Sequence, residues 1–236
     1  MNEPFFAGLS RRIDKRKTTD VPTAGVMVDP KSAQFVLLYN PEYFAGLSDK
    51  EKLGVLKHEF YHLTFEHVTG RKPEGGLTKK DNMCMDLAIN SHLIGELPDK
   101  CCIPGQKPFE WAEPGKSYEW YKANWQDFPE NEEGEGGEGN PSDSFDDHSG
   151  WGETDNTENE IAKERLKEAI KKAAEEANQA GSWGSVPAQC RKEIMDRLKV
   201  RINWEKALRY FIKTSQKADK KSTVRRINKR FPYIHP

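Results

Sequence analysis

Two histidines and a glutamate lie within five residues, in the stretch His58-Glu59-Phe60-Tyr61-His62. On a helix, a spacing of four leaves the two imidazoles about 40° apart, so both can reach one ion. Glu59 lies about 100° from His58, where its carboxylate can take a proton from a zinc-bound water without binding the metal. The stretch therefore predicts one catalytic zinc ion bound by His58 and His62, with Glu59 as the general base that prepares water to attack a peptide carbonyl.

A catalytic zinc needs a third protein ligand and one open position. His67 is nearest, but it lies about 140° from His62 on an unbroken helix, and the four residues between them include no glycine. We therefore expect His67 to face away, as a histidine at the end of the helix. Asp86 is the favoured ligand, because an antiparallel second helix would bring it beside the histidines; a helix-cap or salt-bridge role is its alternative. His92 and Cys84 are weaker candidates.

Two more side chains can orient the ligand imidazoles without touching the metal. Asn90 lies one helical turn after Asp86 and on the same face, and Glu66 lies one turn after His62. Polar groups that hold the second nitrogen of a ligand histidine fix the orientation of its ring.

The histidine pair lies within a predicted amphipathic helix. Ser48-Asp49-Lys50-Glu51 is a capping box, and the helix that it opens should run to about Val68 and end at Gly70. An apolar stripe along this helix disfavours incidental histidines on a surface helix; it consists of Leu53, Leu56, Phe60 and Leu63. Thr78-Lys79-Lys80-Asp81 caps a second helix over about residues 79–94.

The remaining pattern predicts an α+β fold. Residues 24–28 and 34–39 indicate a β-hairpin, and the second of these strands would offer an edge to an extended substrate. We expect a short basic helix at 5–17. Further helices are predicted at 117–125, 158–180, 187–200 and 204–212. A small hairpin-based sheet would thus pack on the two zinc helices, and a helical C-terminal part would follow.

Charge divides the chain into three predicted parts: a core at 1–127, an acidic, glycine-rich linker at 128–157, and a helical region with a basic tail at 158–236. Residues 127–160 hold 13 Asp or Glu and no Lys or Arg, whereas residues 213–230 hold 8 Lys or Arg and one acid. The tail could bind an acidic partner, the linker or nucleic acid, or it is simply solvated; few aromatic residues lie among its charges, which disfavours nucleic acid.

An island of mixed character interrupts the acidic linker at residues 144–151. Exposing the large apolar side chain of Trp151 to water is costly, so we expect the island to pack against the folded part of the protein. If it folds over the zinc cleft, His148 would bind the zinc, block it or stabilise an oxyanion. The alternative is a tryptophan anchor beside an idle histidine.

Bulk composition excludes several classes of protein. No run approaches the ~20 apolar residues of a membrane span, and the N-terminus lacks the basic and apolar regions of a signal peptide. The four cysteines are few and unevenly spaced, which is typical of reduced thiols. We therefore expect a cytoplasmic protein.

With both predicted helices in view, the chain resembles zincin metalloproteases of gluzincin topology, in which the second helix carries a glutamate ligand and an acidic partner four residues later. Here Asp86 and Asn90 stand at those positions. More closely, the chain resembles the metallopeptidase domain that precedes a von Willebrand A-like domain in bacterial and phage proteins, often encoded beside MoxR-type AAA+ ATPases. The residues that carry this resemblance are 56–59, His62, His67, 86–90, 147–151, 173–177 and 203–208.

The resemblance implies a zincin-like fold and a hydrolase that acts on polypeptides. It also implies an AAA+ ATPase as a partner. The alternative function is a zinc-binding, non-proteolytic scaffold or adaptor for a MoxR-type ATPase assembly.

Overall fold

Three strands form one small mixed sheet near the N-terminus. The structure, a computed structural model, describes residues 3–29, 32–70, 76–99, 101–126 and 156–199. Strand β3 (Phe35–Tyr39) is central: β1 (Asp14–Lys17) pairs with it in parallel, and β2 (Ala24–Val28) pairs with it antiparallel. The predicted hairpin at 24–39 is therefore confirmed. The prediction that its second strand offers a free edge is wrong, because β3 has a partner on both sides.

The predicted basic helix at 5–17 is only partly correct. Helix α1 covers Pro4–Ser10 and buries Phe5, Phe6 and Leu9, but Asp14–Lys17 forms the edge strand β1. All four residues of β1 are exposed, so they have no apolar face to press onto a core as a helix would. Charged side chains are well tolerated on an edge strand, where they also discourage pairing with another chain.

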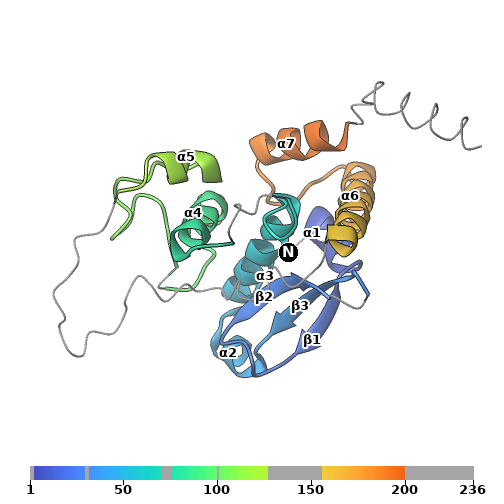
Figure 1. Ribbon diagram of the computed structural model, residues 1–236, viewed down its shortest axis with the longest axis horizontal. Helices are drawn as coiled ribbons and strands as arrows, with labels where there is room; N and C mark the ends of the chain where they lie inside the picture. Colours follow the sequence, from blue (N-terminus) through green and yellow to red (C-terminus); the bar gives the residue numbers. More distant parts are fainter. Residues whose placement is uncertain (1–2, 30–31, 71–75, 100, 127–155, 200–236) are drawn as a thin grey trace, which may run out of the picture. The chain divides into compact units, whose positions relative to one another are not determined.

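The two central helices begin where the sequence predicts. A short helix α2 (Pro41–Gly46) precedes α3 (Asp49–Thr64), and α4 (Lys79–Asn90) follows. Both capping boxes form, since the side chains of Ser48 and Thr78 accept from the backbone N–H of Glu51 and Asp81. Helix α3 packs on β2, and α4 lies against α3 with α5 (Tyr118–Ala123) beside it (Figure 1).

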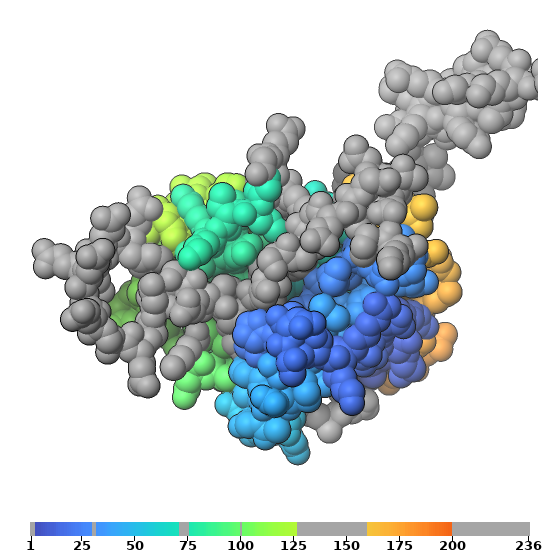
Figure 2. Space-filling view, turned by 60° about the horizontal axis from the view of Figure 1, so that its bottom comes forward, coloured from blue at the N-terminus to red at the C-terminus, as the bar shows by residue number. Residues whose placement is uncertain are grey.

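The long helix α6 (Asn156–Gln179) packs along α1, and α7 (Ala188–Leu198) follows it (Figure 1). A space-filling view shows dark-blue N-terminal residues against the gold of α6 (Figure 2). The helices approach closely at Gly8, where an added Cβ would lie 3.1 Å from the Cα of Ala173. Arg11 and Arg12 both pair with Glu176 across this contact.

One hydrophobic core joins these elements and extends from Phe5 on α1 to Ile194 on α7. The described residues thus form an α+β fold with a small sheet and several helices, as predicted. Within them, no helix is long and apolar enough to cross a membrane. The linker island with His148, the predicted helix at 204–212 and the basic tail lie outside the described residues.

A buried cation ties α3 to three other segments. The Lys57 side chain is 1% exposed, and its Nζ lies 2.9 Å from Oε1 of Glu3 and 2.8 Å from Oε2 of Glu96. Nζ also donates to the Ser185 hydroxyl over 2.7 Å. Gly54, one turn earlier, allows the backbone of Glu96 to approach the helix, since a Cβ there would lie 2.1 Å from the Glu96 carbonyl oxygen. This cluster fixes the helix at the residue before His58.

Candidate metal centre

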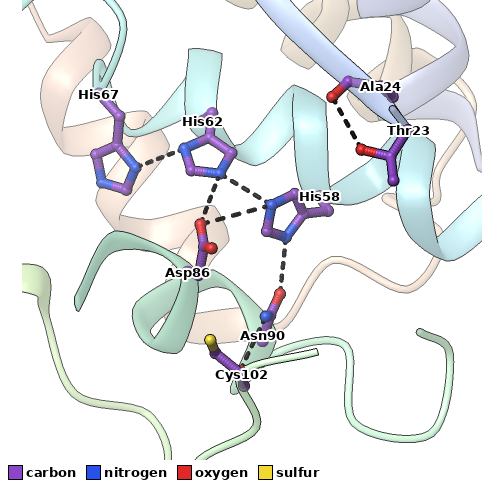
Figure 3. A network of polar contacts seen from close by, with 8 residues as sticks. All are labelled: Thr23, Ala24, His58, His62, His67, Asp86, Asn90 and Cys102. Carbon is purple, nitrogen blue, oxygen red and sulfur yellow. Dashed lines mark hydrogen bonds and ion pairs between the residues drawn. The ribbon is translucent and has the colours of Figure 1, made fainter. Parts of the chain in front are cut away.

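Helices α3 and α4 bring two imidazoles and one carboxylate together. Nε2 of His62 lies 3.0 Å from Nε2 of His58 and 3.3 Å from Oδ1 of Asp86, and Nε2 of His58 lies 3.7 Å from that oxygen. Figure 3 shows the three groups pointing toward one another. Two nitrogens each 2.0–2.1 Å from a tetrahedral zinc would lie about 3.3 Å apart. The spacing and the donor types therefore fit one ion of that size.

Asn90 holds the other nitrogen of His58. Its Oδ1 lies 2.7 Å from Nδ1 of His58, and its Nδ2 donates to the backbone carbonyl of Cys102 over 2.9 Å. Because the Cys102 carbonyl can only accept, the amide oxygen of Asn90 must face His58. Nδ1 of His58 then carries the proton, and the lone pair of its Nε2 points toward Asp86. Asn90 thus lies against the His58 ring, on the side away from Asp86.

His67 does not face away, and the predicted course of α3 is wrong here. The helix ends at Thr64 rather than near Val68, and Glu66 takes a left-handed conformation with φ +61°. The N–H of His67 then bonds to the carbonyl of His62 over 2.9 Å, and that of Glu66 to Leu63 over 3.0 Å. These two bonds define a Schellman motif, which usually has glycine at the left-handed position. The turn carries His67 back toward the metal helix.

The returning imidazole meets His62 on the edge opposite to Asp86. Nδ1 of His67 lies 3.1 Å from Nδ1 of His62, and the His67 side chain is fully buried (Figure 3). Among the described residues, the group of His, Cys, Asp and Glu close enough to share one ion consists of His58, His62 and Asp86. His67 contacts a member of this group from outside it.

The other predicted site residues lie in varied places. Glu59 is fully buried on α3 beside His58, whereas Glu66 is exposed on the outside of the turn. His92 packs against Tyr61 and Phe65 with ring centroids 6.0 and 6.2 Å apart. Cys84 is a buried thiol on α4, and burial raises its pKa to about 12.

The first turn of α4 is held by a buried carboxylate. Asp81 accepts from Thr78 in the capping box, from the Tyr118 hydroxyl over 2.9 Å and from Nζ of Lys122 over 2.6 Å. Burial alone would raise the pKa of Asp81, but the hydrogen bonds from Lys122, Thr78 and Tyr118 lower it to about 2. This network fastens α5 to α4 and so fixes the helix that carries Asp86 and Asn90.

Comparison with known proteins places the chain in a family. A family model described as "Putative metallopeptidase domain" matches residues 1–108 and 110–233, which is nearly the whole chain. No curated protein and no solved structure gives a significant match. The buried His58, His62 and Asp86 are a donor set that a metallopeptidase needs. The chain belongs to the family of the "Putative metallopeptidase domain".

Proposed function

We propose that the protein is a zinc-dependent peptidase with His58, His62 and Asp86 as the metal ligands. The convergence of these three donors from two helices is the observation that carries the proposal. Two imidazoles and one carboxylate are a common donor set for catalytic zinc, which keeps a fourth position for water or substrate. The orienting contact of Asn90 with His58 supports the same assignment, since ligand histidines in metal sites are usually held in this way.

Glu59 is the proposed general base. It follows His58 on α3 and is fully buried, so its carboxylate is kept away from bulk solvent. A bound zinc ion would supply a Lewis acid that lowers the pKa of its water to about 7. The carboxylate of Glu59 would accept a proton from that water and later pass it to the leaving amine. His58, His62 and Asp86 would hold their positions throughout.

The polypeptide substrate would enter as an extended strand. Among the described strands β2 pairs only with β3, and β2 packs on α3, so β2 rather than β3 would supply the pairing edge. His58, Glu59 and His62 are fully buried and Asp86 is 1% exposed. The three donors and the proposed base therefore lie below the protein surface.

Glu59→Gln tests the proposal. The variant keeps the size of the side chain and all three donors, so it should bind one zinc ion per chain and lose cleavage of an unstructured protein such as casein. Removing a general base typically costs about 10²–10⁴-fold in rate. Glu175→Gln, an exposed change on α6, is the matched control and should cleave as wild type does.

Two results would contradict parts of the proposal, the first the role of Glu59 and the second the peptidase activity. Cleavage by Glu59→Gln at the wild-type rate would remove Glu59 from the mechanism. Zinc binding by a wild-type protein that cleaves no unstructured protein would favour the scaffold or adaptor, for which an AAA+ ATPase is the proposed partner.

A further inference from the structure

We infer that His67 is a positioning residue that holds the zinc ligand His62 by accepting a hydrogen bond from it. The inference rests on the proposed zinc site. It assigns to His67 the role of strengthening the binding of zinc by His62. It starts from the 3.1 Å contact between Nδ1 of His67 and Nδ1 of His62, and from ring centroids 5.1 Å apart.

The chemistry of two facing imidazole nitrogens assigns their roles. One of the two nitrogens must donate and the other must accept, so a single proton lies between the rings. Nε2 of His62 faces Asp86 and His58, so it supplies the lone pair for the metal, and Nδ1 of His62 carries the proton. Nδ1 of His67 is therefore the acceptor, and His67 is a neutral imidazole with its own proton on Nε2.

This arrangement gives each ligand histidine a separate partner. Asn90 accepts from Nδ1 of His58, and His67 accepts from Nδ1 of His62. Such partners lock the tautomer and the ring orientation of the ligand and make it a better electron donor. The contact also excludes His67 as a third ligand in this arrangement, because it lies across the His62 ring from Asp86 (Figure 3).

Two features of the fold fix His67 in place. The Schellman motif bonds its N–H to the carbonyl of His62, the same residue that its ring contacts. Its ring also packs near Phe65 and near Tyr118 of α5, with centroids 5.9 and 6.2 Å away. Since Tyr118 donates to Asp81, the position of His67 depends on the attachment of α5 to α4.

Two amide variants separate a hydrogen-bond role from simple packing. In His67→Asn, the amide oxygen can take the place of Nδ1, whereas in His67→Gln the amide group lies one bond further out, near the position of Nε2. Both variants are polar and smaller than or similar in size to histidine, so their folding should differ little. His67→Leu removes the acceptor. His92→Leu is the control, since His92 packs against Phe65 but lies outside the donor group.

Zinc affinity, measured by competition with a chromophoric chelator in the absence of substrate, is the readout. We expect His67→Gln and His67→Leu to bind zinc about 10–100-fold more weakly than wild type. His67→Asn should recover most of this loss, and His92→Leu should bind as wild type does. The cobalt-substituted proteins should keep the wild-type ligand number in their visible spectra, because His67 does not touch the metal.

Three results would overturn the inference. Wild-type affinity in both His67→Gln and His67→Leu would show that the contact does not act on the metal. Equal losses in His67→Asn and His67→Gln would exclude the acceptor role. Loss of one nitrogen ligand from the cobalt spectrum of His67→Leu would make His67 a ligand. If the wild type binds zinc but cleaves nothing, the proposed activity fails while the inference stands; if the wild type binds no zinc, both fail.

Discussion

Replacing Lys57 with methionine would test how the metal helix is held. The substitution keeps an unbranched side chain of similar reach but leaves the carboxylates of Glu3 and Glu96 without their cation. Removing one partner of a buried ion pair costs about 3–5 kcal/mol. The Glu96 side chain is 24% exposed, so water partly replaces the lysine there, and we expect a cost near the lower limit, about 3 kcal/mol. For a chain of this size that corresponds to a fall in Tm of about 6–12 °C.

The measurement is urea and thermal unfolding of metal-free protein, with excess chelator so that zinc binding does not contribute. Lys52→Met on the same helix is the matched control. Lys52 is 38% exposed and lies 3.6 Å from a fully exposed Asp49, so its loss should cost less than about 1 kcal/mol. A cost for Lys57→Met as small as that of Lys52→Met would refute the account of a buried cation that holds α3.

The pH dependence of this loss has a definite sign. Burial alone would raise the pKa of Glu3, but hydrogen bonds from the Ser185 N–H and from Lys57 lower it below 4.5. A lowered pKa contributes stability above pH 4.5 that is lost as the pH falls through the folded-state value. In Lys57→Met, the Glu3 carboxyl gains a proton more readily. The difference between variant and wild type should therefore shrink as the pH falls through 4.5, and a difference that stays constant from pH 7 to well below pH 4.5 would contradict an electrostatic origin.

Two further predictions concern the elements on either side of the site. Glu66→Gly should change the free energy of unfolding by less than about 1 kcal/mol, because the relief of backbone strain at the left-handed position offsets the greater entropy of the unfolded chain. Glu66→Val should cost about 1–2 kcal/mol, because a β-branched residue is strained in this conformation. Urea unfolding of both variants measures the two changes. The lowered pKa of Asp81 contributes stability that is present above pH 3.8 and is lost as the pH falls toward about 2. In Asp81→Asn, the free energy of unfolding should fall less steeply at acid pH than in the wild type, as measured by unfolding followed by circular dichroism. An unchanged pH dependence would exclude Asp81 as the source of this loss.

The sequence predicted the parts of the site that depend on local rules. The capping boxes at Ser48 and Thr78 each join residues three apart, so both helix starts follow from neighbouring side chains alone. The spacing of His58 and His62 places them on one face of α3 in any helix. Asp86 lies beside this pair, where the sequence predicts it on the ground that the loop after the first helix is long enough to fold back.

The predictions from sequence were wrong where tertiary contacts overruled a local conformational preference. The sequence predicts that α3 runs to about Val68 and ends at Gly70, yet Glu66 adopts the left-handed conformation that glycine usually supplies, and the helix ends at Thr64. Rules based on sequence pattern do not include the burial of His67, which becomes possible when the helix ends at Thr64. Likewise, residues 14–17 form a strand only because β3, about 20 residues later, offers them a parallel partner.

The donor geometry depends on contacts that lie away from the donors. Asp86 and Asn90 lie one turn apart on α4, so any movement of that helix shifts a donor and the partner of His58 together. The ion-paired Asp81 at its first turn restrains such movement on one side, and Lys57 restrains α3 on the other. In the part of the site that the structure describes, the turn after α3 contains a strained residue, Glu66, and this turn places the imidazole that contacts His62. The ion pairs of Lys57 and Asp81 therefore fix the positions of the two helices that carry the donors. The turn after α3 fixes the orientation of the His62 ring.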